Sequence, residues 1–452
     1  MKIIIVGCGK VGQTLTKQLS EEKHDVTVID TNSTKISDIT NAYDVMGYIG
    51  NGASYSVQKE AGIDSSDLLI AVTPSDELNL LCCLIAKKAG NVNTIARVRD
   101  PLYSKEIGYI KDELGLSLTV NPEQAAANEI SAILRFPSAN YIERFAKGKV
   151  EILSFKLEEG SPLVGKTLID VGKTYKTETL ICAVQRGENV FIPNGAFILR
   201  EDDLVSIIAS PMAAKEFFTK IGYDTKQVKD TMIVGGGGIA YYLAQQLLRM
   251  GIRVKIVEKD PDRCEHLSEH LPKATIICGD ASNQDVLLEE GIKDCSSFVS
   301  LTGIDEANIF LSLFAKSNTK GKIVTKINHI GFDDIISTFN LGTICAPKDI
   351  TSQRIVSYVR AMQNSIGSNV KTLYKIMEEK VEALEFVINE GAPVIGIPLK
   401  DITLKQNILL GCITRGGNII IPNGMSEIQA GDSVIVITTQ KGLKDIGDIL
   451  KE

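Results

Sequence analysis

The chain has 452 residues, a net charge of −7 and 44% hydrophobic residues. This length predicts several domains, and the lack of a Lys/Arg block argues against nucleic acid as a partner. No apolar run reaches the ~18–20 residues that cross a bilayer, and no secretory leader pattern follows Met1, so we expect a cytosolic protein. The nine cysteines lack CxxC pairing, which indicates reduced, buried thiols.

The sequence contains the same two-domain unit twice. Residues 1–12 (MKIIIVGCGKVG) return at 231–240 (TMIVGGGGIA), and residues 189–197 (NVFIPNGAF) return at 418–426 (NIIIPNGMS). The two motifs return after 228 and 229 positions, respectively. Because one offset fits a glycine-rich loop and an unrelated later motif, the repeating unit is itself two domains, in the order A–B–A′–B′.

The first A unit begins with the fingerprint of a dinucleotide-binding Rossmann fold. Residues 2–6 are predicted as a strand, a helical pattern follows the glycine-rich loop, and a second strand at 25–30 ends on Asp30. We expect a tight turn at the first glycine, phosphate approach at the second, and close packing of helix and strand at the third. The loop residues are Gly7, Cys8, Gly9, Lys10, Val11 and Gly12.

The acid at the end of the second strand predicts the class of nucleotide. Asp30 can accept hydrogen bonds from ribose hydroxyls, and it would repel a 2′-phosphate. The pattern therefore favours NAD(H) or an adenosine nucleotide over NADP(H). The alternative is a tight strand–helix turn without a ligand.

Three further strands of this unit are predicted at 45–49, 68–72 and 94–98, and their loops meet at the ligand-binding edge of a doubly wound sheet. Thr73 or Ser75 can cap the following helix, with Asp76 and Glu77 in its first turn, where they favour the helix dipole. Arg97 or Arg99 is available to further phosphates of a nucleotide, and the alternative is pairing with surface carboxylates.

The second A unit repeats these features with differences. Its loop is Gly235–Gly238, its second strand ends on Glu258, and Lys326 stands where the first copy has Arg97. Lys is a point charge without the bidentate fork of Arg, so we expect a weaker grip on a polyphosphate. The second site should still bind an adenosine dinucleotide.

Each B unit is short, strand-rich and free of any catalytic cluster. Strands are predicted at 151–157, 180–185 and 203–208, with repeats at 383–388, 408–414 and 432–437. The Pro-Asn-Gly segments at 193–195 and 422–424 predict tight turns with positive φ. Segments 122–135 and 350–380 are predicted as amphipathic helices that either pack on their own sheets or serve as dimerisation arms.

The sequence offers little for catalysis. A dehydrogenase needs a proton donor or acceptor beside the nicotinamide, and the chain has only His24, His266, His270 and His329. His266 and His270 have the i, i+4 spacing of a metal pair, but an exposed polar helix is the favoured interpretation. We predict neither catalytic nor metal-binding residues; the alternative function is a tandem NAD-dependent oxidoreductase.

The motifs GCGKVG, VTVID, GNGAS, LLIAVTPSDELN and ARVRDPLY in the first half, with GDAS and TGIDEAN in the second, resemble the TrkA family. These are cytosolic regulatory subunits of Trk-type bacterial potassium uptake systems, built from tandem RCK units. The resemblance implies an α/β fold with two doubly wound Rossmann-like parallel sheets, each followed by a small β-rich lobe. The implied domains span residues 1–136, 140–222, 228–350 and 370–452.

The resemblance also implies partners and ligands. It predicts a homotetrameric ring that docks on a membrane potassium-translocating subunit of the TrkH/TrkG type at the inner face of the membrane, with NAD(H) and/or ATP/ADP as ligands. The residues implied for the first site are Gly7, Gly9, Gly12, Asp30, Asn51, Ala53, Thr73, Asp76 and Arg97. Those implied for the second are Gly235, Gly237, Gly238, Glu258, Asp280 and Thr302. The all-glycine second loop departs from the family pattern.

Overall fold

The computed structural model describes residues 1–90, 92–145, 149–223, 227–328, 339, 341–365, 370–377 and 380–451. The chain divides into two compact units, one of residues 1–131 and 229–356 and one of residues 132–228 and 357–452. Within the described residues, no helix combines the length and the apolar character that a membrane crossing requires.

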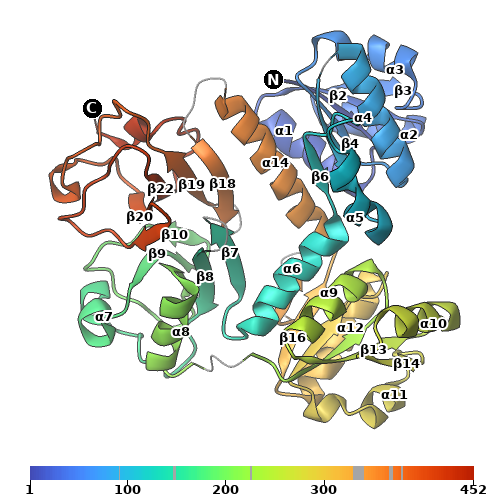
Figure 1. Cartoon of the computed structure of the whole chain (residues 1–452). Coiled ribbons are helices and arrows are strands. Elements are labelled where there is room, and N and C mark those ends of the chain that lie inside the picture. The colour runs from blue at the N-terminus through green and yellow to red at the C-terminus, as the bar shows by residue number, and fades with distance from the viewer. Residues whose placement is uncertain are drawn as a thin grey trace. The chain divides into compact units, whose positions relative to one another are not determined.

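The first Rossmann domain is a parallel sheet with strand order β3-β2-β1-β4-β5-β6 (Figure 1). Its central strands β1 and β4 are runs of Ile, Val, Leu and Ala whose side chains are buried, as a sheet covered on both faces requires. The strands are β1 (Lys2–Val6), β2 (Asp25–Asp30), β3 (Met46–Ile49), β4 (Leu68–Ala71), β5 (Asn93–Arg97) and β6 (Leu118–Val120). The helices are α1 (Lys10–Glu21), α2 (Ser33–Ala42), α3 (Tyr55–Glu60), η1 (Ile63–Ser65), α4 (Asp76–Gly90), α5 (Pro101–Ile110) and α6 (Pro122–Arg135).

The second Rossmann domain repeats this topology, with strand order β14-β13-β12-β15-β16-β17. The strands are β12 (Asp230–Val234), β13 (Arg253–Glu258), β14 (Thr275–Cys278), β15 (Ser297–Ser300), β16 (Lys322–Lys326) and β17 (Thr343–Cys345). The helices are α9 (Gly238–Arg249), α10 (Pro261–His270), α11 (Gln284–Glu289), η3 (Ile292–Asp294), α12 (Asp305–Asn318) and α14 (Pro347–Ser365). In both sheets the strand order reverses beside the first strand, and this switch point is where such folds bind ligands.

The two Rossmann domains contact each other through α6 and α9, which lie side by side (Figure 1). Ser131 Oγ and Gln246 Oε1 are 2.6 Å apart, and Gln246 also donates to Asn128 Oδ1 at 2.7 Å. The Asn121 side chain donates to the Tyr242 hydroxyl at 3.0 Å. The segment predicted as a helix at 122–135 therefore belongs to the first Rossmann domain and contacts the second through hydrogen bonds.

The second unit holds two antiparallel sheets of matching topology, with orders β10-β9-β11-β8-β7 and β21-β20-β22-β19-β18. In the first lobe the elements are β7 (Tyr141–Phe145), β8 (Val150–Lys156), α7 (Leu168–Tyr175), β9 (Thr179–Arg186), β10 (Asn189–Phe191), β11 (Leu204–Ala209) and α8 (Pro211–Lys220). In the second they are β18 (Val370–Ile376), β19 (Val381–Val387), η4 (Leu399–Asp401), β20 (Ile408–Arg415), β21 (Asn418–Ile420), β22 (Ser433–Thr438) and η5 (Ile446–Ile449).

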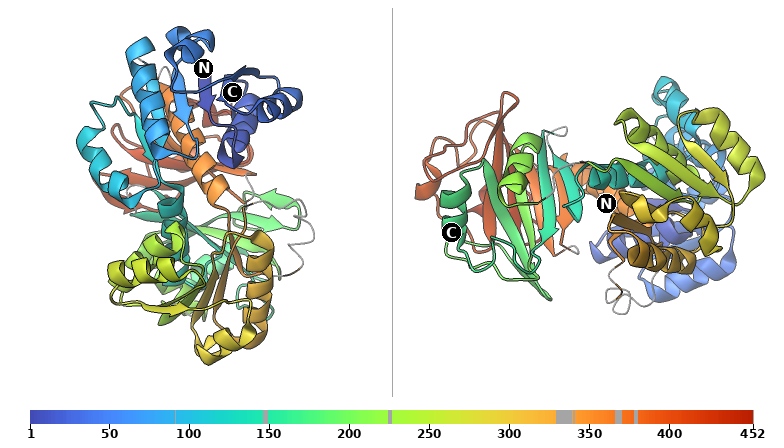
Figure 2. Two further views of the ribbon diagram at one scale, coloured as in Figure 1. Left: turned by 90° about the vertical axis from the view of Figure 1, so that its right-hand side faces the viewer. Right: turned by 90° about the horizontal axis from the view of Figure 1, so that it is seen from below.

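The two lobes share one hydrophobic core, and Figure 2 gives further views of their strands. Phe145 and Ile152 of the first lobe belong to the same buried cluster as Ala383 and Ile437 of the second. The sheets approach closely: a Cβ at Gly411 would lie 2.3 Å from Cδ1 of Ile208 in the other lobe. A larger residue at this crossing would require the Ile208 side chain to shift.

The predicted α/β class, with two parallel Rossmann sheets each followed by a small β-rich lobe, is confirmed. The predicted helix at 350–380 is wrong in its last third, because α14 begins at Pro347 and ends at Ser365 while 370–376 is a strand. That strand pairs in antiparallel fashion with β19, the next strand along the chain, and helical periodicity does not report this pairing. Residues 366–369 and 378–379 of this segment lie outside the described residues.

Two other local expectations need correction. Strand β7 was not predicted; it adds an edge strand to the first lobe by pairing with β8. The Pro-Asn-Gly segments do not use positive φ. Instead, Asn194 Oδ1 accepts from Ala196 N at 3.0 Å, and Asn423 Oδ1 accepts from Met425 N at 2.9 Å. These are Asx turns, in which the side chain replaces a backbone acceptor. The four predicted domain boundaries stay predictions.

Candidate nucleotide-binding sites

The glycine-rich loop of the first domain follows β1 and begins α1, at the carboxyl edge of the sheet. Gly7 has φ of 102° and donates its N–H to Ile29 O at 2.8 Å. A Cβ at Gly12 would lie 1.9 Å from Gly7 O, so helix and loop touch as predicted. Gly9 is the extended N-cap of α1, and a Cβ built on it meets nothing within 4 Å. The space above Gly9 is thus open to a phosphate.

Asp30 ends β2 and holds this loop in place. Its Oδ2 accepts from Cys8 N at 2.7 Å, and its Oδ1 accepts from Asn32 N at 2.9 Å. Burial, reinforced by the Asp30 charge, raises the pKa of the Cys8 thiol to about 12. Cys8 is therefore a neutral, buried side chain. Within the same loop, Lys10 is exposed and Val11 is buried at the start of α1. We call the loops that follow strands β1 to β5, together with Asp30 at the end of β2, the first cradle.

A buried asparagine that the sequence analysis did not single out joins the ends of β4 and β5. Asn79 Oδ1 accepts from Thr73 N and Thr73 Oγ1, both at 2.8 Å. Asn79 Nδ2 donates to Thr73 O at 3.1 Å and to Arg97 O at 2.9 Å. Arg97 Nη2 in turn donates to Thr73 O. Thr73 and Arg97 are thereby brought together at the mouth of the first cradle.

The second domain has the same bridge, which shows that it belongs to the fold. Asn308 Oδ1 accepts from Thr302 N at 2.8 Å, and Asn308 Nδ2 donates to Lys326 O at 3.0 Å. Lys326 Nζ donates to Thr302 O at 2.7 Å, as Arg97 does in the first copy. The signal was present in the repeat, because TPSDELN and TGIDEAN place Asn at the same distance from Thr.

Asp76 faces the backbone of the loop after β5. Its buried carboxylate accepts from Arg99 N at 2.7 Å and from Asp100 N at 2.8 Å. Ser75 caps α4 as predicted, because its Oγ accepts from Leu78 N at 3.1 Å. The loop after β3 is shaped by Asn51, whose Oδ1 accepts from Ala53 N at 2.9 Å. These residues all lie at the carboxyl edge of the sheet.

The loops after β12 to β16 form the second cradle. Gly235 has φ of 96° and donates to Val257 O at 2.9 Å, and a Cβ on Gly237 meets nothing within 4 Å. Glu258 takes the place of Asp30, with its Oε2 accepting from Gly236 N at 2.6 Å. Asp280 repeats the turn of Asn51, its Oδ1 accepting from Ser282 N at 2.9 Å.

Charged side chains gather where α6 of the first domain approaches the second cradle. Arg99 Nη1 lies 4.0 Å from Glu123 Oε1, and Arg99 Nε lies 3.8 Å from Asp76 Oδ1. Burial lowers the pKa of Arg97, and it raises the pKa of Glu123. Among the described residues, Arg97 Nε and Glu123 Oε2 are buried without a hydrogen-bond partner. Buried polar atoms of this kind ordinarily find a partner in a ligand or water.

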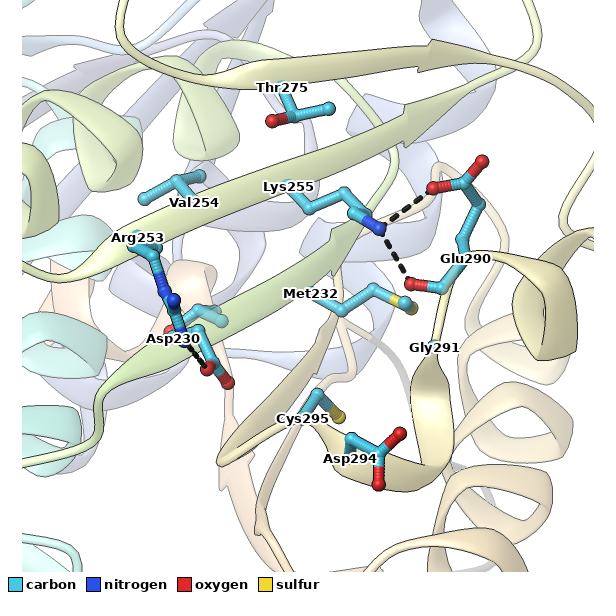
Figure 3. A pocket seen from close by; sticks show the side chains of 11 residues that line it. Asp230, Met232, Arg253, Val254, Lys255, Thr275, Glu290, Gly291, Asp294 and Cys295 are labelled. Atoms are coloured by element: carbon cyan, nitrogen blue, oxygen red, sulfur yellow. Dashed lines mark hydrogen bonds and ion pairs between the residues drawn. The ribbon is translucent and has the colours of Figure 1, made fainter.

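A pocket of about 270 Å³ lies at the other edge of the second sheet (Figure 3). The amino ends of β12, β13 and β14 line it. Both of its basic side chains are already paired: Lys255 Nζ donates to Glu290 Oε2 at 2.7 Å, and Arg253 Nη2 donates to Asp230 Oδ2 at 2.8 Å. The pocket is therefore separate from the cradle, which lies at the carboxyl edge.

The histidines and cysteines do not form a metal cluster within the described residues. His266 and His270 stack with ring centroids 4.2 Å apart, and His270 Nδ1 lies 2.8 Å from His266 O. His329 lies outside the described residues. The nine cysteines are free, and seven of them are buried as expected. Cys278 is exposed, on the edge strand β14, and Cys295 is half-buried.

The fold and the two cradles define a protein with tandem Rossmann domains, each followed in the chain by a small β-rich lobe. The model of the TrkA-N domain matches residues 3–122 and 231–347, and that of the TrkA-C domain matches residues 152–222 and 383–451. The Trk system potassium uptake protein TrkA of Halomonas elongata is 31% identical over 444 residues, covering 98% of this chain and 96% of that protein. The protein of the same name from Vibrio alginolyticus is 30% identical, with 99% and 98% covered. The chain belongs to the TrkA family.

Solved structures share the fold. The GsuK RCK domain aligns with a TM-score of 0.65 at 18% identity, covering 97% of this chain and 92% of that one. A structure described as the GsuK channel bound to NAD aligns with the same TM-score and identity, covering 97% and 77%. The human SLO3 gating ring aligns with a TM-score of 0.50 at 12% identity, covering 97% and 99%.

Proposed function

We propose that this chain is a nucleotide-sensing regulatory subunit that controls a membrane potassium uptake channel or transporter. Relatives that match almost its whole length carry the name Trk system potassium uptake protein TrkA. Proteins of the same fold include a channel bound to NAD and a gating ring. The observation that carries the proposal is the first cradle, where the space above Gly9 is open and Asp30 fixes the loop.

The proposed ligand is NAD(H), ATP or ADP. The N–H groups of the loop and the positive end of α1 suit a phosphate at Gly9. Asp30 retains lone pairs for ribose hydroxyls beside its bond to Cys8 N. Arg97 offers a buried Nε without a hydrogen-bond partner among the described residues. The full proposed lining of the first cradle is Gly7, Cys8, Gly9, Lys10, Val11, Gly12, Asp30, Asn51, Ala53, Thr73, Asp76 and Arg97.

Nucleotide binding can be relayed because the ligand would compete with contacts inside the protein. Arg97 Nη2 donates to Thr73 O, and Arg99 Nη2 donates to Pro74 O at 2.5 Å. A phosphate that draws either guanidinium away changes how the ends of β4 and β5 are held. Only a ligand that stabilises one arrangement more than the other shifts their populations, so the relay requires no chemical change in the nucleotide.

The proposed assembly is a ring of four chains at the inner face of the cell membrane. The ring would dock on a potassium-translocating subunit of the TrkH/TrkG type and act there without catalysis. Copurification of the chain with such a subunit, and a solution mass equal to four chains, are the expected results. A monomeric chain that never associates with the membrane subunit would contradict this assembly.

The cradle is tested by Gly9→Ala with Gly108→Ala as its matched control. Both substitutions add one methyl group to open space in the same domain, and neither glycine has a positive φ. Calorimetry with NADH, NAD, ATP and ADP should show at least about tenfold weaker binding for Gly9→Ala, or about 1.4 kcal/mol, and no change for the control. Potassium uptake in cells that depend on this chain should lose its nucleotide response in parallel. Equal binding by the two variants would refute the site.

The phosphate role of Arg97 has its own test. Arg97→Ala should weaken ATP more than NADH if the guanidinium contacts a third phosphate. Equal losses for both ligands would assign Arg97 to the bridge with Thr73 alone, because that contact supports the loop whichever ligand is present.

A further inference from the structure

The second glycine-rich loop has two glycines where the first has side chains, and an acidic residue packs on each. Gly236 stands in the place of Cys8, and a Cβ there would lie 2.6 Å from Leu267 Cδ1 and 3.1 Å from Glu258 Oε2. Glu258 is one methylene longer than Asp30, and its Oε2 accepts from Gly236 N at 2.6 Å as Asp30 Oδ2 accepts from Cys8 N. Gly238 stands in the place of Lys10, and a Cβ there would lie 3.0 Å from Glu123 Cγ. The all-glycine loop thus makes room for carboxylate side chains of the same chain.

Glu123 comes from the first Rossmann domain, as the second residue of α6. Its side chain lies against Gly238, the first residue of α9, directly after the open N-cap Gly237. The Glu123 side chain is 24% exposed, and its Oε1 lies 4.0 Å from Arg99 Nη1. Its Oε2 is buried and has no hydrogen bond from the described residues. Burial lowers the pKa of Lys326, the cation of the second cradle. The Glu123 charge opposes part of this shift.

We propose that Glu123 is the residue that makes the second cradle reject nucleotide phosphates, so that each chain binds one nucleotide, in the first cradle. This inference rests on the proposed function for the identity of the ligand. The N-terminus of α9 would otherwise attract an anion. The space at Gly237 is open, but the Glu123 side chain lies against the neighbouring Gly238. A phosphate at Gly237 would therefore lie close to the Glu123 carboxylate, and two like charges at short range repel strongly in a half-buried site.

The acid at position 123 is not repeated at the matching position of the second domain. The residue at the matching place in the second domain is Lys348, the second residue of α14, after the same strand-and-proline sequence that precedes Glu123. The two halves of the chain thus carry opposite charges at this position. The asymmetry is one of charge sign and is independent of the Arg97 and Lys326 difference at the ends of β5 and β16.

The test counts binding sites on the full chain. Equilibrium dialysis with ATP and with NADH should give one nucleotide per wild-type chain. Glu123→Ala removes the charge and the bulk, and Glu123→Gln removes the charge alone. Both should add a second site, or tighten second-site binding by at least about tenfold, with the larger effect for Glu123→Ala. Glu113→Gln, which removes a charge from an exposed position of the same domain, is the matched control and should leave the count at one.

A double variant shows whether the gained site is the second cradle. Adding Gly237→Ala to Glu123→Ala should abolish the second site, because the new methyl group enters the space open to a phosphate. Two sites of similar affinity in the wild type, or no gain in either Glu123 variant, would overturn the inference. A wild type that binds no nucleotide would refute the proposed function instead. In that case a site gained in Glu123→Ala still supports the role of Glu123, and no gain still overturns it.

Discussion

The asparagine bridge between β4 and β5 gives a stability prediction that can be worked out from its hydrogen bonds. Asn79→Ala removes four of them, two to Oδ1 and two from Nδ2. Asn79 is completely buried, so its loss leaves Thr73 N without an acceptor and lowers the free energy of unfolding by about 1–3 kcal/mol. Each of the other three lost bonds adds about 0.5–1.5 kcal/mol. Because water can enter the vacated space, we expect a total loss of about 3–6 kcal/mol.

This loss is measurable by urea unfolding and thermal denaturation of the full chain. It corresponds to a fall in Tm on the order of 10 °C for a domain of this size. Asn41→Ala, at an exposed position of α2, is the matched control and should change little. Asn308→Ala should repeat the loss in the second domain, since its bridge is the same. If Asn79→Ala stays within about 1 kcal/mol of the control, the bridge does not support the fold as argued.

Three further predictions concern the loop, the lobes and a buried thiol. Gly12→Ala should lower both Tm and nucleotide affinity, because the new Cβ would lie 1.9 Å from Gly7 O; an unchanged Tm would contradict the close packing. Arg186→Ala should cost about 3–5 kcal/mol in urea unfolding, because it removes the cation that holds the completely buried Asp203 carboxylate with two bonds of 2.7 and 2.8 Å and leaves it the Arg200 N–H. A loss below about 1 kcal/mol would argue against this. Burial raises the pKa of Cys8 from 9.0 to about 12, so the unfolded chain ionises first and stability should fall as pH rises from 9 towards 12. Cys8→Ala should make that fall shallower, and equal slopes would refute the assignment.

Features that depend on local sequence were predictable. The strand, the glycine-rich loop and Asp30 fall within thirty residues, and each has a fixed backbone role, so their arrangement follows from spacing. The repeat then placed the second Rossmann domain. The Ser75 cap was predictable for the same reason, because the Ser75 hydroxyl accepts from a backbone N–H only three residues further along the chain.

Features that depend on contacts between distant parts of the chain could not be predicted from the sequence. The role of Asn79 requires knowing that the ends of β4 and β5 are adjacent. The Arg186–Asp203 pair joins residues 17 positions apart across β9 and β11. Glu123 lies more than one hundred residues from Gly238, so no local pattern could connect them.

The shared core of the two lobes has a consequence for how this chain can evolve. Phe145 and Ile152 on one side meet Ala383 and Ile437 on the other inside one polypeptide, so the chain carries its own pairing partner. In a symmetric homodimer a single codon sets the residue on both sides of the axis. Here each side has its own codon, and a glutamate can stand at position 123 while a lysine stands at 348. Joining the two copies covalently therefore lets one half specialise for ligand while the other diverges.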